Sequence, residues 1–161
     1  MCNKLSRLEI ARRLRLIVIE FLYETKGIVP CHLEGTCAIC SKTLAKLFKD
    51  FGYPATAVEG SFDANYINHC WVESENYIYD ITISQFQKDF PRLHLPEVLV
   101  VSIGNGDMGK LFADRNYRIK ENEWPKEQKP TKELIQQLTT IFYDRYGKPS
   151  KIPARKTKNT N

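Results

Sequence analysis

The chain has 161 residues, of which 42% are apolar and 27% charged, a balance typical of one globular domain and not of a disordered or low-complexity protein. The net charge of +5 arises entirely from residues 147–161, which carry five Lys and Arg side chains and no acidic one. The rest of the chain is neutral, which argues against specific nucleic-acid binding. We therefore predict a single domain over residues 1–146, followed by a flexible basic tail.

The composition also bears on the compartment. The longest uninterrupted apolar run, Leu16 to Ile19, is too short to cross a bilayer, and the first residues lack the pattern of a secretory signal. Five cysteines, an odd number, then favour reduced thiols over a disulfide framework. We expect a cytoplasmic protein that does not bind membranes.

The first predicted elements are two helices. An amphipathic pattern runs over about residues 5–24 and starts with a capping box at Ser6. A second helix is predicted from Thr36 or Cys37 to Phe51, with Thr36 as its N-cap.

The elements that follow are mostly strands. Alternating β-branched and aromatic residues predict strands at 56–60, 67–73, 77–81 and 96–102, and a helical period predicts a last helix over about 131–146. Residues 104–107 contain two glycines. This composition predicts a loop that forms a turn or a mobile flap. Helices, then strands, then a helix is the order of an α+β fold and not of alternating βαβ units, with a core over about residues 34–102.

The first candidate for chemistry is Cys37, which follows Gly35 at the start of the second helix. Unpaired backbone N–H groups and the positive end of the helix dipole lower the pKa of a thiol at this position and favour the thiolate. Cys40 lies one turn further in, among Leu44 and Leu47, and is expected to be a small buried hydrophobe. We predict that Cys37 is the nucleophile.

His69 and Asp80 lie on the two strands of a predicted hairpin. With an even-numbered loop centred on residues 74–75, His69 directly faces Asp80, at a Cβ separation of about 4.5–5.5 Å. In such an arrangement the Cys37 thiolate attacks an acyl carbon, His69 transfers the proton, and Asp80 fixes the orientation of the imidazole. Gln85, shortly after Asp80, is a further candidate to line the site.

Four short motifs follow one another over about residues 34–86: Gly35-Thr36-Cys37, Gly52-Tyr53-Pro54-Ala55, His69-x-Trp71-Val72-Glu73 and Asp80-x-Thr82. Together they resemble the transglutaminase-like superfamily, which includes transglutaminases, cysteine peptidases and the leader-peptidase proteins of lasso-peptide maturation. The resemblance implies a papain-like core in which the helix bearing Cys37 packs on an antiparallel sheet bearing His69 and Asp80. It also implies catalytic roles for these three residues. The chain departs from the family pattern at Tyr53, Thr56 and Cys70, outside the triad.

These observations predict a thiol-dependent enzyme that forms a thioester from an amide or peptide substrate, without a cofactor. Hydrolysis by a cysteine peptidase or amidase is favoured, because so short a chain has little surface for a second substrate. A protein-glutamine transglutaminase or deamidase is the alternative, and a peptide or protein is the expected partner. A hypothesis of another class is an inactive or zinc-containing binding module on the same fold, with Cys31, Cys37 and Cys40 as ligands.

Overall fold

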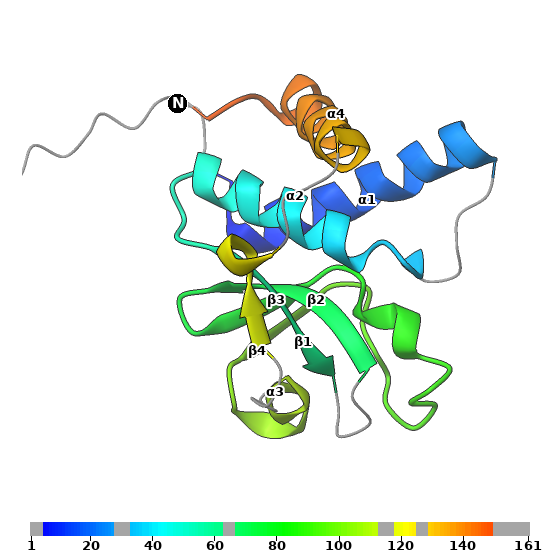
Figure 1. Ribbon diagram of the computed structural model, residues 1–161, viewed down its shortest axis with the longest axis vertical. Coiled ribbons are helices and arrows are strands. Elements are labelled where there is room, and N and C mark those ends of the chain that lie inside the picture. The colour runs from blue at the N-terminus through cyan, green and yellow to red at the C-terminus, as the bar shows by residue number, and fades with distance from the viewer. Residues whose placement is uncertain (1–4, 28–32, 63–66, 113–117, 125–128, 150–161) are drawn as a thin grey trace, which may run out of the picture.

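The computed structural model describes residues 5–27, 33–62, 67–112, 118–124 and 129–149 (Figure 1). The helices in these ranges are α1 (Arg7–Lys26), α2 (Cys37–Asp50), α3 (Gly106–Leu111) and α4 (Lys129–Tyr146), and the short 3-10 helices are η2 (Ile83–Phe86) and η3 (Glu121–Glu123). The strands are β1 (Thr56–Phe62), β2 (Ile67–Ser74), β3 (Tyr77–Asp80), β4 (Leu99–Ser102) and β5 (Arg118–Lys120). Most of the predicted basic tail, residues 150–161, lies outside the described residues.

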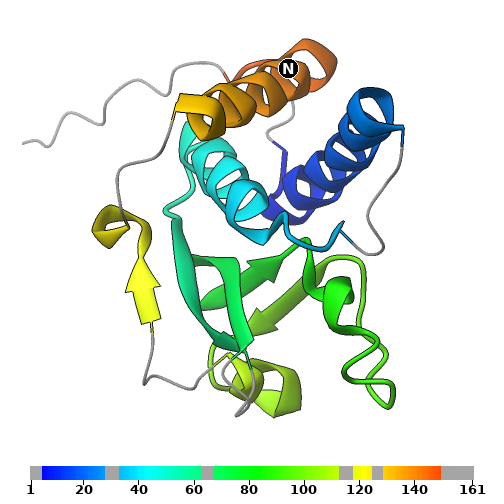
Figure 2. The ribbon, with the colours of Figure 1, turned by 45° about the vertical axis from the view of Figure 1, so that its right-hand side comes forward.

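The strands form one antiparallel sheet in the order β4-β3-β2-β1-β5, so the predicted α+β class is confirmed. Figures 1 and 2 show α1, α2 and α4 gathered on one side of this sheet and α3 on the other. Because side chains alternate along a strand, neighbouring residues enter different cores. Val72 and Tyr79 pack under the helices, whereas Trp71 and Ile78 pack with Phe112 on the other face.

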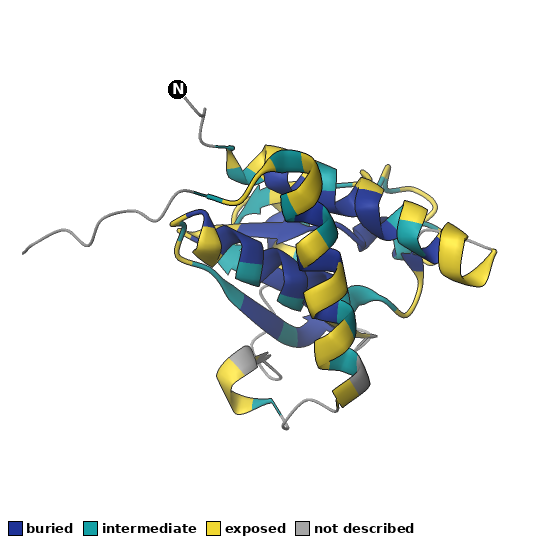
Figure 3. Ribbon diagram, turned by 90° about the horizontal axis from the view of Figure 1, so that it is seen from above, coloured by how far each residue is buried: buried dark blue, intermediate teal, exposed yellow. Residues whose placement is uncertain are grey.

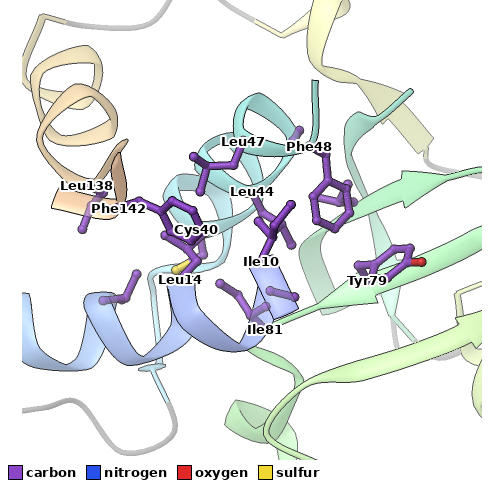
Figure 4. Packing of buried hydrophobic residues seen from close by; sticks show 14 of the residues in the cluster. Ile10, Leu14, Cys40, Leu44, Leu47, Phe48, Tyr79, Ile81, Leu138 and Phe142 are labelled. Carbon is purple, nitrogen blue, oxygen red and sulfur yellow. The ribbon is translucent and has the colours of Figure 1, made fainter. Parts of the chain in front are cut away.

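The helical side of the molecule holds the larger core. Leu14 from α1, Leu44 and Phe48 from α2, and Phe142 from α4 are each fully buried there. Figure 4 shows these side chains converging, with Cys40 lying between Leu14 and Phe142. Viewed from the helical side, the outward surfaces of the helices are largely exposed and the strands beneath them are buried (Figure 3).

The ends of the first two helices test the predicted caps. At the start of α1 the Glu9 backbone N–H donates to the Ser6 hydroxyl and the Ser6 N–H donates to the Glu9 carboxylate, which confirms the capping box. Thr36 immediately precedes α2, but its hydroxyl donates to the Leu33 carbonyl at 2.7 Å and caps no helical N–H group. Thr36 is therefore the N-cap residue, as predicted, but its side chain makes no capping hydrogen bond.

The hairpin of β2 and β3 forms with a different register from the predicted one. Val72 pairs with Tyr79, and the loop consists of Glu75 and Asn76, whose φ angles are 48° and 64°. Two consecutive positive φ angles are typical of a type I′ turn, which matches the twist of a two-residue hairpin. The predicted direct pairing of His69 with Asp80 is therefore wrong by two residues. A shift of two residues keeps every side chain on its predicted face, because the period of a strand is two.

The second half of the chain differs more from the prediction. β4 begins at Leu99 instead of residue 96, and α3 begins at Gly106, inside the segment predicted to be a loop. This short helix lies so close to β4 that a Cβ atom on Gly109 would lie 2.4 Å from the Ser102 carbonyl oxygen. Such close packing requires glycine. Across the described ranges, no helix has both the length and the apolar content to cross a membrane.

Candidate active site

The Asp80 carboxylate is fixed at the end of β3 and binds His69. Its Oδ1 accepts hydrogen bonds from the Thr82 backbone N–H at 2.8 Å and from the Thr82 hydroxyl at 3.0 Å. Its Oδ2 lies 2.5 Å from His69 Nε2, and both side chains are almost completely buried. Extended by one pair, the observed register places Asp80 beside Trp71, so Asp80 reaches His69 diagonally.

The segment after Asp80 is held by two further side chains. Arg15 of α1 is 5% exposed, and its guanidinium donates to the Ile81 carbonyl at 2.5 Å and to the Ser84 hydroxyl at 3.3 Å. Gln85 donates its amide to the Thr82 carbonyl at 3.1 Å, and the same nitrogen lies 3.3 Å from His69 Nδ1. Gln85 is thus beside the predicted triad.

The sequence analysis did not predict a role for Arg15, although its position among the apolar residues of α1 indicates a buried charge. Arg15 lies four residues after Ala11 and three before Val18, on the apolar stripe of α1. A charged residue on such a stripe indicates either a buried partner or an interruption of the stripe. Here the partners are the Ile81 carbonyl and the Ser84 hydroxyl, which ties α1 to the segment that follows Asp80.

Cys37 is the first residue of α2 and lies beside β2 at His69 and Cys70. A hydrogen bond with the Cys70 thiol lowers the pKa of Cys37 most. Burial opposes this shift. His69, through a hydrogen bond and its charge, and the Cys70 backbone N–H, through a hydrogen bond, lower the pKa of Cys37 further, to about 4. The structure therefore brings Cys37, His69 and Asp80 together in one row.

The open edge of β2 explains why Cys37 contacts two adjacent residues of one strand. Adjacent side chains on a strand point to opposite faces. The described ladder between β2 and β3 runs from Ser74 to Val72, so β3 does not pair with β2 at Cys70. The N-terminus of α2 lies at this edge, and the sulfur of Cys37 meets the Cys70 backbone N–H together with the side chains on either side of the strand.

His69 is positioned to carry a positive charge. Burial opposes that charge, but the Asp80 carboxylate and Cys37 outweigh burial and raise the pKa of His69 to about 9. The Phe86 ring meets the imidazole edge-on at 4.8 Å between centroids and Phe62 lies at 6.1 Å, so apolar groups surround the ring. At neutral pH the expected state is a Cys37 thiolate paired with a His69 imidazolium.

The two neighbouring thiols, Cys40 and Cys70, have raised pKa values and therefore stay protonated. Cys40 is 1% exposed, its thiol donates to the Thr36 hydroxyl at 3.5 Å, and burial raises its pKa to about 12. The pKa of Cys70 is also raised, first because it shares a hydrogen bond with Cys37 and second because it is buried. Of these three thiols, Cys37 alone is favoured as a thiolate.

Other sites are less suited to chemistry or lie outside the described residues. A cavity of about 670 Å³ between α2 and α4 is lined by Lys46, Asp50, Thr139 and Tyr143 and does not include the triad. Within the described ranges, no cluster of three or more His, Cys, Asp or Glu side chains is placed to hold a metal ion. Cys31, a ligand in the zinc hypothesis, lies outside those ranges.

The structure brings Cys37, His69 and Asp80 together, although not by the predicted direct pairing of His69 with Asp80. The papain-like core and the superfamily remain predictions. Comparison of the chain with protein-family models, with curated proteins and with solved structures found no match.

Proposed function

We propose that the chain is a thiol-dependent acyl-transfer enzyme with Cys37 as nucleophile, His69 as acid and base, and Asp80 as the residue that orients His69. The observation that carries this proposal is the row of contacts from the Cys37 sulfur to the His69 ring and from His69 Nε2 to Asp80. A structural ion pair also perturbs pKa values, but it does not require a thiol beside the imidazole. A thiolate, an imidazolium and an orienting carboxylate together are the groups that acyl transfer uses.

The geometry indicates a role for each group. The Cys37 thiolate attacks the carbonyl carbon of an amide, and the carbonyl π electrons move to the oxygen. Backbone N–H groups in the first turn of α2 have no helical acceptors and stabilise that oxyanion. Because Asp80 holds Nε2–H, His69 delivers its proton to the leaving amine from Nδ1. The C–N bond breaks and leaves a thioester on Cys37.

The second half-reaction determines the class of enzyme. His69 accepts a proton from water or from an amine, and that nucleophile attacks the thioester and releases the Cys37 thiolate. We favour water, which makes the protein a cysteine peptidase or amidase that acts on a peptide or protein. Transfer to an amine, as in the transglutaminases that the motifs resemble, uses the same three residues and is the alternative.

An activated ester tests the proposal without knowledge of the natural substrate. We expect p-nitrophenyl acetate to give a burst of nitrophenolate and to add one acetyl group at Cys37, detected by peptide mass spectrometry. Cys37→Ala should abolish the burst and Cys40→Ala should retain it. His69→Ala should slow acylation by about 10²–10⁴-fold, the usual contribution of a general acid or base. Acetylation elsewhere, or an equal burst from Cys37→Ala, refutes the assignment.

Product analysis then separates the remaining possibilities. With ethanolamine present, formation of free acetate supports a hydrolase, and formation of the acetyl amide supports a transferase. Metal analysis of the same preparation tests the binding-module hypothesis. Near-stoichiometric zinc that is lost in Cys37→Ala, without acylation of the wild-type chain, would replace the enzyme by a zinc-containing module.

A further inference from the structure

Cys70 is a buried thiol that the acyl-transfer chemistry does not use. It is 5% exposed, it follows His69 directly on β2, and its side chain shares a hydrogen bond with the Cys37 sulfur. Cys37 is half-buried and therefore reachable from solvent. A reachable thiolate in contact with a second, protonated thiol is the arrangement that reversible thiol oxidation requires.

We propose that Cys70 is a resolving thiol, which forms a disulfide with Cys37 after a hydroperoxide has oxidised Cys37, and that this bond protects and reversibly switches off the nucleophile. The loss of catalytic activity rests on the function proposed above. The formation of the bond rests on the contact between the two thiols alone.

Two balanced steps form the bond. The Cys37 thiolate attacks one oxygen of hydrogen peroxide, the O–O bond breaks, and the products are a Cys37 sulfenic acid and hydroxide. The Cys70 sulfur then attacks the Cys37 sulfur, the S–O bond breaks, and the Cys70 proton leaves with the departing hydroxyl as water. Two thiols are oxidised by two electrons and one peroxide is reduced. An external dithiol restores both cysteines by exchange.

The structure favours Cys70 over Cys40 as the resolving residue. Cys40 follows Cys37 by three positions, a Cys-x-x-Cys spacing, so it is the rival partner. Its thiol, however, is bound to the Thr36 hydroxyl and packs in the helical core, next to Leu14 and Phe142 in Figure 4. A disulfide to Cys40 would remove that sulfur from its packing, whereas the Cys70 side chain already shares a hydrogen bond with Cys37.

The test follows the sulfur chemistry directly. The reduced full chain is titrated with hydrogen peroxide, free thiols are blocked with N-ethylmaleimide, and peptides are mapped by mass spectrometry before and after dithiothreitol. We expect a Cys37–Cys70 disulfide in the wild type and in Cys40→Ala, with full recovery of Cys37 by dithiothreitol. In Cys70→Ala and Cys70→Ser, Cys37 should proceed to sulfinic acid, and the recoverable Cys37 should fall by about tenfold or more.

Several outcomes would overturn the inference. These are a Cys37–Cys40 disulfide, sulfinic acid in the wild type at the same peroxide dose as in Cys70→Ala, or full recovery of Cys37 in both Cys70 variants. Circular dichroism of the two variants checks that each is folded, and the serine variant keeps a side chain of nearly the same size. A chain that forms the disulfide but is not acylated by the ester would refute the proposed function and retain this inference. Acylation of Cys37 without formation of the disulfide would refute this inference and retain the proposed function.

Discussion

The pH dependence of Cys37 alkylation is the sharpest consequence of the site. A pKa of about 4 keeps Cys37 almost fully ionised above pH 5, whereas an ordinary thiol with a pKa near 8.5 is about 0.03% ionised at pH 5. The intrinsic nucleophilicity of a thiolate falls with its pKa, by about 100-fold over this difference. We therefore expect Cys37 to react with iodoacetamide about thirtyfold faster than a free thiol at pH 5 and about twentyfold slower at pH 8.

The shape of the profile is more informative than the absolute rate. The rate should rise around pH 4, remain flat between about pH 5 and 8, and rise again near pH 9, where His69 loses its proton and the thiolate loses its partner. A free thiol changes nearly a thousandfold between pH 5 and 8. Quenched alkylation with peptide-level mass spectrometry measures the rate at Cys37 separately from the other cysteines, and N-acetylcysteine provides the reference.

Two variants separate the possible causes of the low pKa. His69→Ala should move the lower midpoint up by about 1–3 pH units, the usual effect of removing an adjacent opposite charge. Asp80→Asn keeps the shape of the carboxyl group but removes the charge that raises the pKa of His69, so the upper step should move below pH 9. Circular dichroism at each pH identifies acid unfolding. A single rise near pH 8.5 in the folded wild type refutes the ion pair, and a flat profile that persists in His69→Ala refutes the role of His69.

Three further predictions concern stability and are measured by urea denaturation. Arg15→Lys should lower the free energy of unfolding by about 1–3 kcal/mol, because one ammonium group does not span both the Ile81 carbonyl and the Ser84 hydroxyl; an unchanged value would contradict the bridging role. Phe48→Ala should cost about 3–5 kcal/mol, since Phe48 is fully buried and its ring packs in the helical core, and a loss below 1 kcal/mol would show that the core repacks. Asn76→Ala should cost about 1 kcal/mol whereas Asn76→Gly should not, because the φ angle of 64° disfavours alanine; equal losses would exclude backbone conformation as the cause.

The fold was predictable wherever a local pattern determines it. The capping box at Ser6 and the apolar periods of α1, α2 and α4 depend on residues within one or two turns of each other. α3 was not predictable in this way, since Gly106 and Gly109 disfavour a helix. Its position depends on close packing of Gly109 against β4, a contact that no local pattern contains.

The three residues of the predicted site lie together in the fold, but the predicted hairpin register is wrong by two residues. The thiol at a helix start, the histidine and the carboxylate each have a recognisable local setting. The turn was placed one residue too early, because no Asn-Gly pair marks it and Glu75 is an uncommon residue at a positive φ angle. Arg15 and Cys70 were missed, because Arg15 meets the segment after Asp80, and Cys70 meets Cys37, only in the folded chain.

The early end of β3 connects these features. Asp80 turns its carboxylate back to bind the Thr82 backbone N–H, and this local bond stops the strand at the point where β2 continues past it. The uncovered edge of β2 then receives the first turn of α2, which explains why one sulfur meets both His69 and Cys70. Asp80 therefore both binds His69 and ends β3 at the point where Cys37 meets His69 and Cys70 of β2.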